Sequence, residues 1–147
     1  MSAIETYEVY AIRYATLARK ASDNFIGGDP HEEGSPLDYF VWLARSPSRM
    51  FVIDTGFDAS VAERRGRKML LAPDIGLKRL GVDAAEVREV IITHLHYDHV
   101  GNFALFPKAT FHLQDKEMQY ATGRHMAQPI FSHAYEVEEV VAMVRHV

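Results

Sequence analysis

VIITHLHYDHVG, residues 90–101, places a run of apolar and β-branched residues directly before a dense group of potential metal ligands. The first residues of this stretch are typical of a buried strand. Four side chains that can bind a metal follow within six positions, and we call them the histidine cluster: His94, His96, Asp98 and His99. Their place behind a buried strand favours a metal site over a chance grouping of surface histidines.

Strand geometry indicates how the histidine cluster can serve two metal ions. Residues i and i+2 of a strand point to the same side, so His94 and His96 can aim their imidazoles at one point. The chain then turns, and Asp98 and His99 emerge as an adjacent pair facing a nearby point. Imidazole and carboxylate ligands suit Zn²⁺, Fe²⁺ or Mn²⁺. The spacing therefore predicts two pairs of ligands for two neighbouring divalent ions.

Composition excludes several kinds of site and partner. The 147 residues correspond to one domain, and 48% hydrophobic with 24% charged residues is ordinary globular composition. Cysteine is absent, which excludes disulfides and thiolate metal sites and fits the cytoplasmic location that we expect. The net charge of −4 does not indicate a nucleic-acid partner, and no apolar run approaches the ~20 residues of a membrane span. We expect a small-molecule substrate, with no nucleic-acid or membrane partner.

Hydrophobic periodicity predicts a mixture of strands and helices. Strands are expected over residues 6–15, 39–45, 49–56, 87–93 and 109–114. Helices are expected over residues 58–70, 73–82, 100–107, 115–123 and 134–147. A long polar connection, residues 16–38, separates the first two strands, and connections of this length are usually functional or disordered. The order of the elements predicts an α/β or α+β layered domain.

The stretch THLHYDHVGN, residues 93–102, resembles the H-x-H-x-D-H signature of the metallo-β-lactamase superfamily of dinuclear hydrolases. FVIDTGF, residues 51–57, is similar to the strand and Asp-x-Gly element that precedes this signature, and LFPKATFHLQDKEM, residues 105–118, resembles the segment that follows it. The overall similarity is nearest to the N-acyl homoserine lactonase-like group. It implies a metallo-β-lactamase-like αβ/βα sandwich, of which residues 1–147 would be the N-terminal portion of a single domain, about its first half.

The resemblance also implies a role for each residue of the histidine cluster. His94 and His96 would bind the first metal, and Asp98 and His99 the second. Asp98 would also be the catalytic residue, touching a metal-bridging hydroxide that attacks a lactone or ester-like carbonyl, or the departing oxygen. Asp54 would hold the ligand loop, because ligating imidazoles need an outer partner to fix their tautomer, although an ordinary turn residue is the alternative. Two divalent ions are implied, zinc first, with iron or manganese as alternatives.

The family pattern continues with ligands that this chain lacks: a third histidine for the first metal, a bridging aspartate and a last histidine. None of the later histidines stands in a matching context: His112, His125, His133 and His146. Catalytic zinc normally has three protein ligands plus water, so the chain would supply about half of each site. We therefore expect a fragment that needs a C-terminal half, with an uncovered sheet face that favours association, including a homodimer.

The substrate pocket is expected between the histidine cluster and the connection 16–38. Phe25, Ile26 and Phe57 are candidates for its apolar wall, with core packing as their ordinary alternative, and Met126 and Tyr120 are weaker candidates. Other functions stay open. These are a glyoxalase II-like thioesterase or a β-lactamase-like amide hydrolase on the same fold, a nuclease of the superfamily, and an inactive truncated chain. The mild negative charge disfavours the nuclease.

Overall fold

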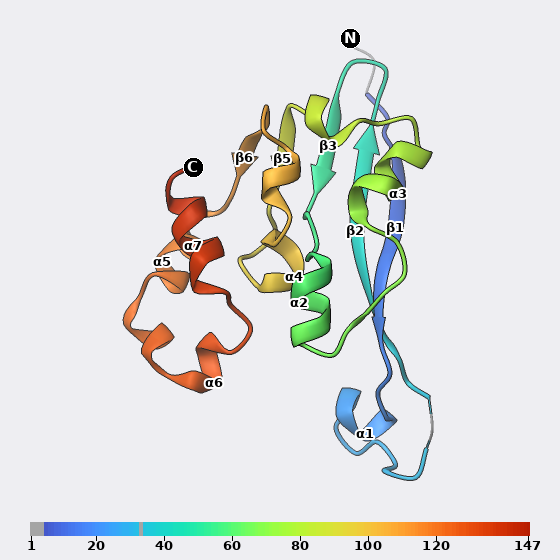
Figure 1. Ribbon diagram of the computed structural model, residues 1–147, viewed down its shortest axis with the longest axis vertical. Helices are drawn as coiled ribbons and strands as arrows, with labels where there is room; N and C mark the ends of the chain where they lie inside the picture. Colours follow the sequence, from blue (N-terminus) through green and yellow to red (C-terminus); the bar gives the residue numbers. More distant parts are fainter. Residues whose placement is uncertain (1–4, 33) are drawn as a thin grey trace.

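A six-stranded mixed sheet forms the centre of the computed structural model, which describes residues 5–32 and 34–147 (Figure 1). The strand order is β4-β1-β2-β3-β5-β6, with antiparallel pairing from β4 to β3 and parallel pairing from β3 to β6. The strands are β1 Glu8–Leu17, β2 Leu37–Arg45, β3 Met50–Ile53, β4 Lys68–Met69, β5 Glu89–Ile91 and β6 Thr110–His112. The mixed α/β architecture predicted from the sequence is confirmed.

The hairpin of β1 and β2 follows the predicted alternation. Tyr14 on β1, and Val41 and Leu43 on β2, point to one face and are fully buried. The connection between the two strands extends beyond the end of the sheet and carries the short helix α1, Ala21–Asn24 (Figure 1). The predicted polar connection therefore contains one helical turn, and it projects away from the sheet.

The α-helices after α1 are α2 Ala59–Arg64, α3 Pro73–Arg79, α4 Tyr97–Val100, α5 Asp115–Ala121, α6 Pro129–Ser132 and α7 Val137–Val144. Three 3₁₀ turns connect them: Ala84–Glu86, Phe103–Leu105 and Arg124–Ala127. In Figure 1, α2, α3 and α4 lie near strands β1 to β5, whereas α5, α6 and α7 gather on the β6 side. Within the described ranges, no helix combines the length and apolar composition that crossing a membrane requires.

The helix expected over residues 58–70 is shorter than predicted. Its start is as expected, because the Asp58 side chain accepts a hydrogen bond from the backbone N–H of Val61 at 2.8 Å. The chain leaves the helix at Gly66, which has a φ of +65°. Lys68 and Met69 then pair with β1 as a short edge strand. Pairing with the free edge of the sheet therefore determines the structure of Lys68 and Met69, although the local spacing of apolar residues is helical.

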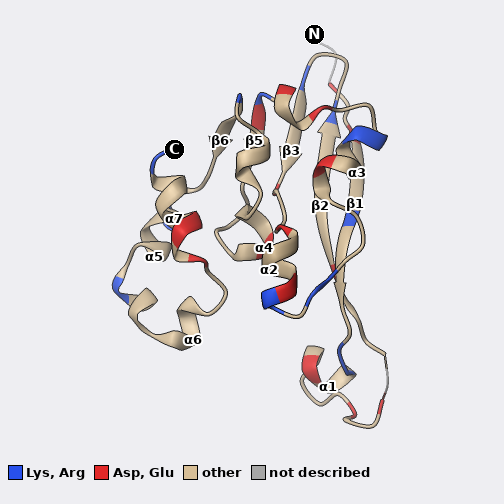
Figure 2. Cartoon of the chain, viewed as in Figure 1, with Lys and Arg blue, Asp and Glu red and all other residues tan. Residues whose placement is uncertain are grey.

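The second face of the sheet carries a row of apolar side chains. Ala11, Trp42, Ile53 and Ile91 are direct cross-strand neighbours from β1 to β5. They point away from the buried core, and Trp42 keeps 39% of its surface exposed. We call this row and its surroundings the open sheet face. Acidic and basic residues are interspersed along the described chain (Figure 2).

Candidate metal centre

The histidine cluster lies at the carboxyl ends of two adjacent parallel strands. β3 and β5 pair in parallel, with Ile53 opposite Ile91, so the residues after both strands meet at one edge. The backbone N–H of Asp54 donates to the carbonyl of Ile91 at 2.8 Å. Binding sites in α/β proteins commonly form at this edge. The short helix α4 begins at Tyr97 and places the second pair of ligands on its first turn.

Side-chain distances show that the four predicted ligands are gathered at one place. The ring centroids of His94 and His96 are 4.4 Å apart, and those of His94 and His99 are 3.8 Å apart. The Nε2 atom of His99 lies 3.4 Å from Oδ2 of Asp98. The cluster is therefore compact, with His94 and His96 next to the pair on α4. The strand predicted over residues 87–93 is shorter than expected, because β5 ends at Ile91, and His94 and His96 lie in the loop between β5 and α4.

Asp54 contacts the histidine cluster directly from the end of β3. Its Oδ2 lies 2.8 Å from Nδ1 of His99, and its Oδ1 accepts a hydrogen bond from the backbone N–H of Thr93 at 2.8 Å. Asp54 as a residue is 3% exposed, so its carboxylate is buried. A proton on Nδ1 of His99 completes the first bond, which leaves Nε2 facing Asp98. Asp54 thus fixes the orientation of the His99 ring and the loop before the cluster.

The charges of the cluster follow from burial and from these contacts. Burial lowers the pKa of His99, but hydrogen bonds to Asp54 and Asp98 outweigh it and raise the pKa to about 9. Burial and the neighbouring imidazoles lower the pKa of His94, and burial lowers that of His96. His94 and His96 are therefore neutral at neutral pH, which is the form that binds metals.

Residues far away in the sequence support the ligand loop. The hydroxyl of Tyr14 donates to the carbonyl of Asp98 at 2.8 Å, from the middle of β1. Oε1 of Glu117 accepts hydrogen bonds from the backbone N–H of Leu95 at 2.9 Å and from the Tyr135 hydroxyl at 3.2 Å. These roles could not be predicted from the sequence, because each depends on a long-range contact.

The donor types of the cluster fit divalent cations of the zinc class. However, within residues 5–32 and 34–147, no three histidine, aspartate or glutamate side chains are placed so that they can hold one ion. A catalytic zinc ion normally needs three protein ligands. The described residues therefore supply suitable donors and an outer hydrogen-bond partner, but they do not complete a ligand set by themselves.

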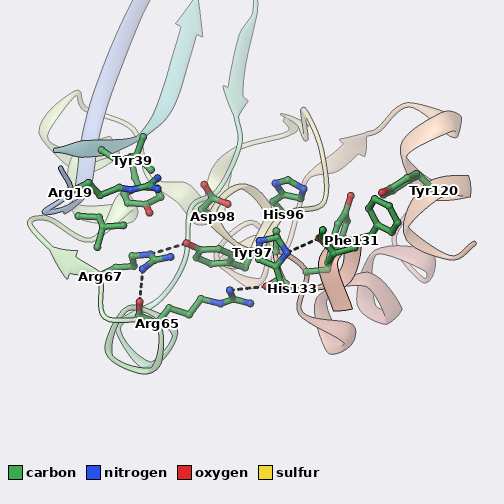
Figure 3. Close-up of a pocket in the computed structure, with 15 residues that line it drawn as sticks. Arg19, Tyr39, Arg65, Arg67, His96, Tyr97, Asp98, Tyr120, Phe131 and His133 are labelled. Atoms are coloured by element: carbon green, nitrogen blue, oxygen red, sulfur yellow. Dashed lines mark hydrogen bonds between the residues drawn. The ribbon is translucent and has the colours of Figure 1, made fainter. Parts of the chain in front are cut away.

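A cavity of about 770 Å³ opens beside the cluster (Figure 3). Its lining includes His96 and Asp98, which lie in the middle of the view. Arg19, Arg67 and Tyr39 lie on one side of them. The other side is lined by aromatic and aliphatic residues, Tyr120, Ile130, Phe131 and Tyr135. A substrate over the cluster would contact both sides.

The three predicted wall residues lie elsewhere. Phe57 is fully buried and packs edge-on against Tyr14 with ring centroids 4.9 Å apart, so it belongs to the core. Phe25 and Ile26 are exposed on the connection that projects beyond the sheet, and neither lines the cavity. Of the two weaker candidates, Tyr120 lines the cavity and Met126 does not. The expected location is borne out in part, because Leu17, Arg19 and Leu37 of the connection 16–38 line the cavity together with His96 and Asp98.

Comparison with known proteins identifies relatives of this chain. Residues 34–131 match the Metallo-beta-lactamase superfamily. The N-acyl homoserine lactonase AttM of Agrobacterium fabrum is 47% identical over 106 residues, which span 60% of this chain and 40% of that protein. The Probable metallo-hydrolase Rv2300c of Mycobacterium tuberculosis is 28% identical over 100 residues, spanning 60% of this chain and 32% of that protein.

Solved structures share the fold. A quorum-quenching N-acyl homoserine lactone lactonase matches with a TM-score of 0.64 and 22% identity, covering 96% of this chain and 55% of that one. The hydrolase AbOPH matches with a TM-score of 0.67 and 18% identity, covering 95% and 55%. The chain thus spans about half of these structures and less than half of the curated relatives. The family match covers most of the chain, and this protein belongs to the metallo-beta-lactamase superfamily.

Proposed function

We propose that the protein to which this chain belongs is a metal-dependent hydrolase that opens a lactone or ester-like bond. The observation that carries this proposal is the compact histidine cluster, tied to Asp54 and placed beside an open cavity. The similarity to AttM, named as an N-acyl homoserine lactonase, supports lactones as the substrate class. The activity is assigned to a protein of the relatives' length, because this chain spans only part of it.

The histidine cluster and Asp54 would have the following roles. His94 and His96 would hold one divalent ion, and Asp98 and His99 the other. When bound, such ions supply an ionised water and polarise a carbonyl. Burial raises the pKa of Asp98, but the contact with His99 outweighs this effect and lowers the pKa, so the carboxylate is ionised beside the cavity. Asp54 keeps the ring of His99 in place during the reaction.

Zinc is the metal that we propose first, and the missing ligands would come from the part of the relatives' length that this chain does not span. We also propose a cytoplasmic location, on the absence of cysteine.

The test is metal content and hydrolysis in a protein of the relatives' length that contains this chain. We expect about two equivalents of metal and hydrolysis of an N-acyl homoserine lactone. The His96→Ala variant should lose metal binding and hydrolysis. His112→Ala is the control, because His112 pairs with Glu89 on β5, outside the cluster. Faster hydrolysis of a thioester or a β-lactam would replace the lactone assignment. A folded protein with no bound metal would support the inactive alternative and contradict the proposal.

A further inference from the structure

The cavity beside the histidine cluster has a cationic side that the proposed reaction does not explain. Arg19 and Arg67 lie there with Tyr39 (Figure 3), and we call these two arginines the arginine wall. Within residues 5–32 and 34–147, neither of them forms an ion pair with a carboxylate. Arg65, which also lines the cavity, differs, because its Nη2 lies 2.8 Å from Oε1 of Glu136.

Both arginines of the wall are held by neutral acceptors. Nε of Arg67 donates to the hydroxyl of Tyr97 at 3.0 Å, and its Nη1 donates to the carbonyl of Arg65 at 2.6 Å. Nη2 of Arg19 donates to the carbonyl of Asp23 at 2.7 Å. These bonds fix the guanidinium groups without neutralising them, and both residues are partly buried. A guanidinium group that is held by neutral acceptors keeps its charge and is suited to bind an anion, because its fork presents several donors in a plane.

The rest of the cavity restricts which anion fits. The side opposite the arginine wall is apolar and aromatic, including Ile130 and Phe131. Asp98 lies between the two sides (Figure 3). A ligand with one carboxylate and one apolar end therefore matches both sides, with its middle over the cluster.

We infer that Arg19 and Arg67 form a subsite for a carboxylate group of the substrate. The preferred substrate is then a lactone or ester that carries one carboxylate away from the bond that is hydrolysed, and an apolar chain. A neutral lactone bound in the cavity would leave the two guanidinium groups without a charged partner. It would therefore bind less tightly than a lactone that carries a carboxylate. The identification as a substrate subsite rests on the proposed function, whereas carboxylate binding itself does not.

The test uses the 147-residue chain freed of metal with a chelator, so that a carboxylate cannot bind through a metal ion. Calorimetric titration compares hexanoate with the neutral hexanamide. At low salt we expect hexanoate to bind about tenfold more tightly than hexanamide, because only hexanoate can form a charge-assisted hydrogen bond with a guanidinium group. This difference in affinity should disappear as the salt concentration is raised. Arg19→Gln and Arg67→Gln should each remove most of the difference, and Arg67→Lys should keep part of it.

Arg79→Gln is the matched control, because Arg79 is exposed on α3, does not line the cavity, and loses the same charge. Equal affinities for hexanoate and hexanamide, or no binding of hexanoate, would overturn the inference. So would an unchanged preference in the Arg19→Gln variant, which tests the subsite even if Arg67→Gln fails to fold. Tighter binding of inorganic phosphate than of hexanoate would overturn the carboxylate assignment. If hydrolysis fails in the longer protein while this preference remains, only the proposed function fails.

Discussion

Asp54 occupies a strained backbone conformation that its side chain explains. Its φ is +61°, and this left-handed region costs about 1–2 kcal/mol for a residue with a Cβ. Glycine would fit the backbone better, but it would leave His99 and Thr93 without their shared acceptor. The aspartate at this position is therefore required by the ligand loop rather than by the turn.

Replacing Asp54 by asparagine tests this link. We expect Asp54→Asn to lower the pKa of His99 from about 9 toward its ordinary value of 6.5, because one negative partner is lost. A raised histidine pKa stabilises the fold below pH 6.5 and loses that effect as pH rises through 9. The stability difference between wild type and variant should therefore shrink from pH 6 to pH 10.

Histidine NMR titration of the metal-free chain measures the pKa, and thermal unfolding measures the stability. Asp58→Asn is the control, because Asp58 caps α2 away from the cluster. An unchanged His99 pKa in Asp54→Asn would show that the contact is not electrostatically important.

Glu139 on α7 is a half-buried acid that forms no ion pair with the described residues. Burial, with the nearby Glu136 and Asp58, raises its pKa to about 8, and its Oε2 has no hydrogen-bond partner in the described part of the chain. A carboxyl whose pKa is raised on folding destabilises the fold as pH rises from 4.5 through 8. Glu139→Gln should therefore add about 1–2 kcal/mol at pH 9, after allowing for solvent screening, and nothing at pH 4.

Urea unfolding at the two pH values checks the Glu139 prediction. Glu138→Gln provides the matched control on the exposed side of the same helix. A pH-independent effect of Glu139→Gln would point to packing instead of charge.

At the scale of elements, the turn between β3 and α2 is constrained by β1. Gly56 has a φ of +73°, and a Cβ there would lie 2.9 Å from Cζ of Tyr14. Gly66 has a similar φ of +65°, but a Cβ there would meet no atom within 4 Å. We expect Gly66→Ala to cost about 1 kcal/mol and Gly56→Ala about 3 kcal/mol or more, measured by urea unfolding. Equal costs would mean that the Tyr14 ring moves freely aside.

Element prediction succeeded where the hydrophobic period was long and failed where elements were short. The strands β1 and β2 were predicted correctly, because each carries apolar residues over most of its length. The four-residue helices Arg124–Ala127 and Pro129–Ser132 were not predicted, since a single turn carries no measurable period. The helix expected over 58–70 stopped early because its second part paired with the edge of the sheet.

At the scale of the whole molecule, the open sheet face is an exposed apolar surface, and it leads to a prediction about self-association. Trp42 and its apolar neighbours lie on the side of the sheet away from the core. Exposed apolar patches favour association, so we expect the 147-residue chain to self-associate with increasing concentration. Trp42→Glu should reduce this association in sedimentation equilibrium. Val137→Glu, on the exposed side of α7, should not. A wild-type chain that stays monomeric at all concentrations would contradict the prediction.

The sequence alone determined the α/β class and the identity of the histidine cluster. Both follow from local spacing, because strand alternation and a turn fix relations over only a few residues. Tertiary structure decided the rest. It brought Asp54 to His99 across 45 positions and Tyr14 to Asp98 across 84, and it put Phe57 in the core. Such contacts depend on strand register and on which faces pack together, and neither can be read from the spacing of residues along one segment.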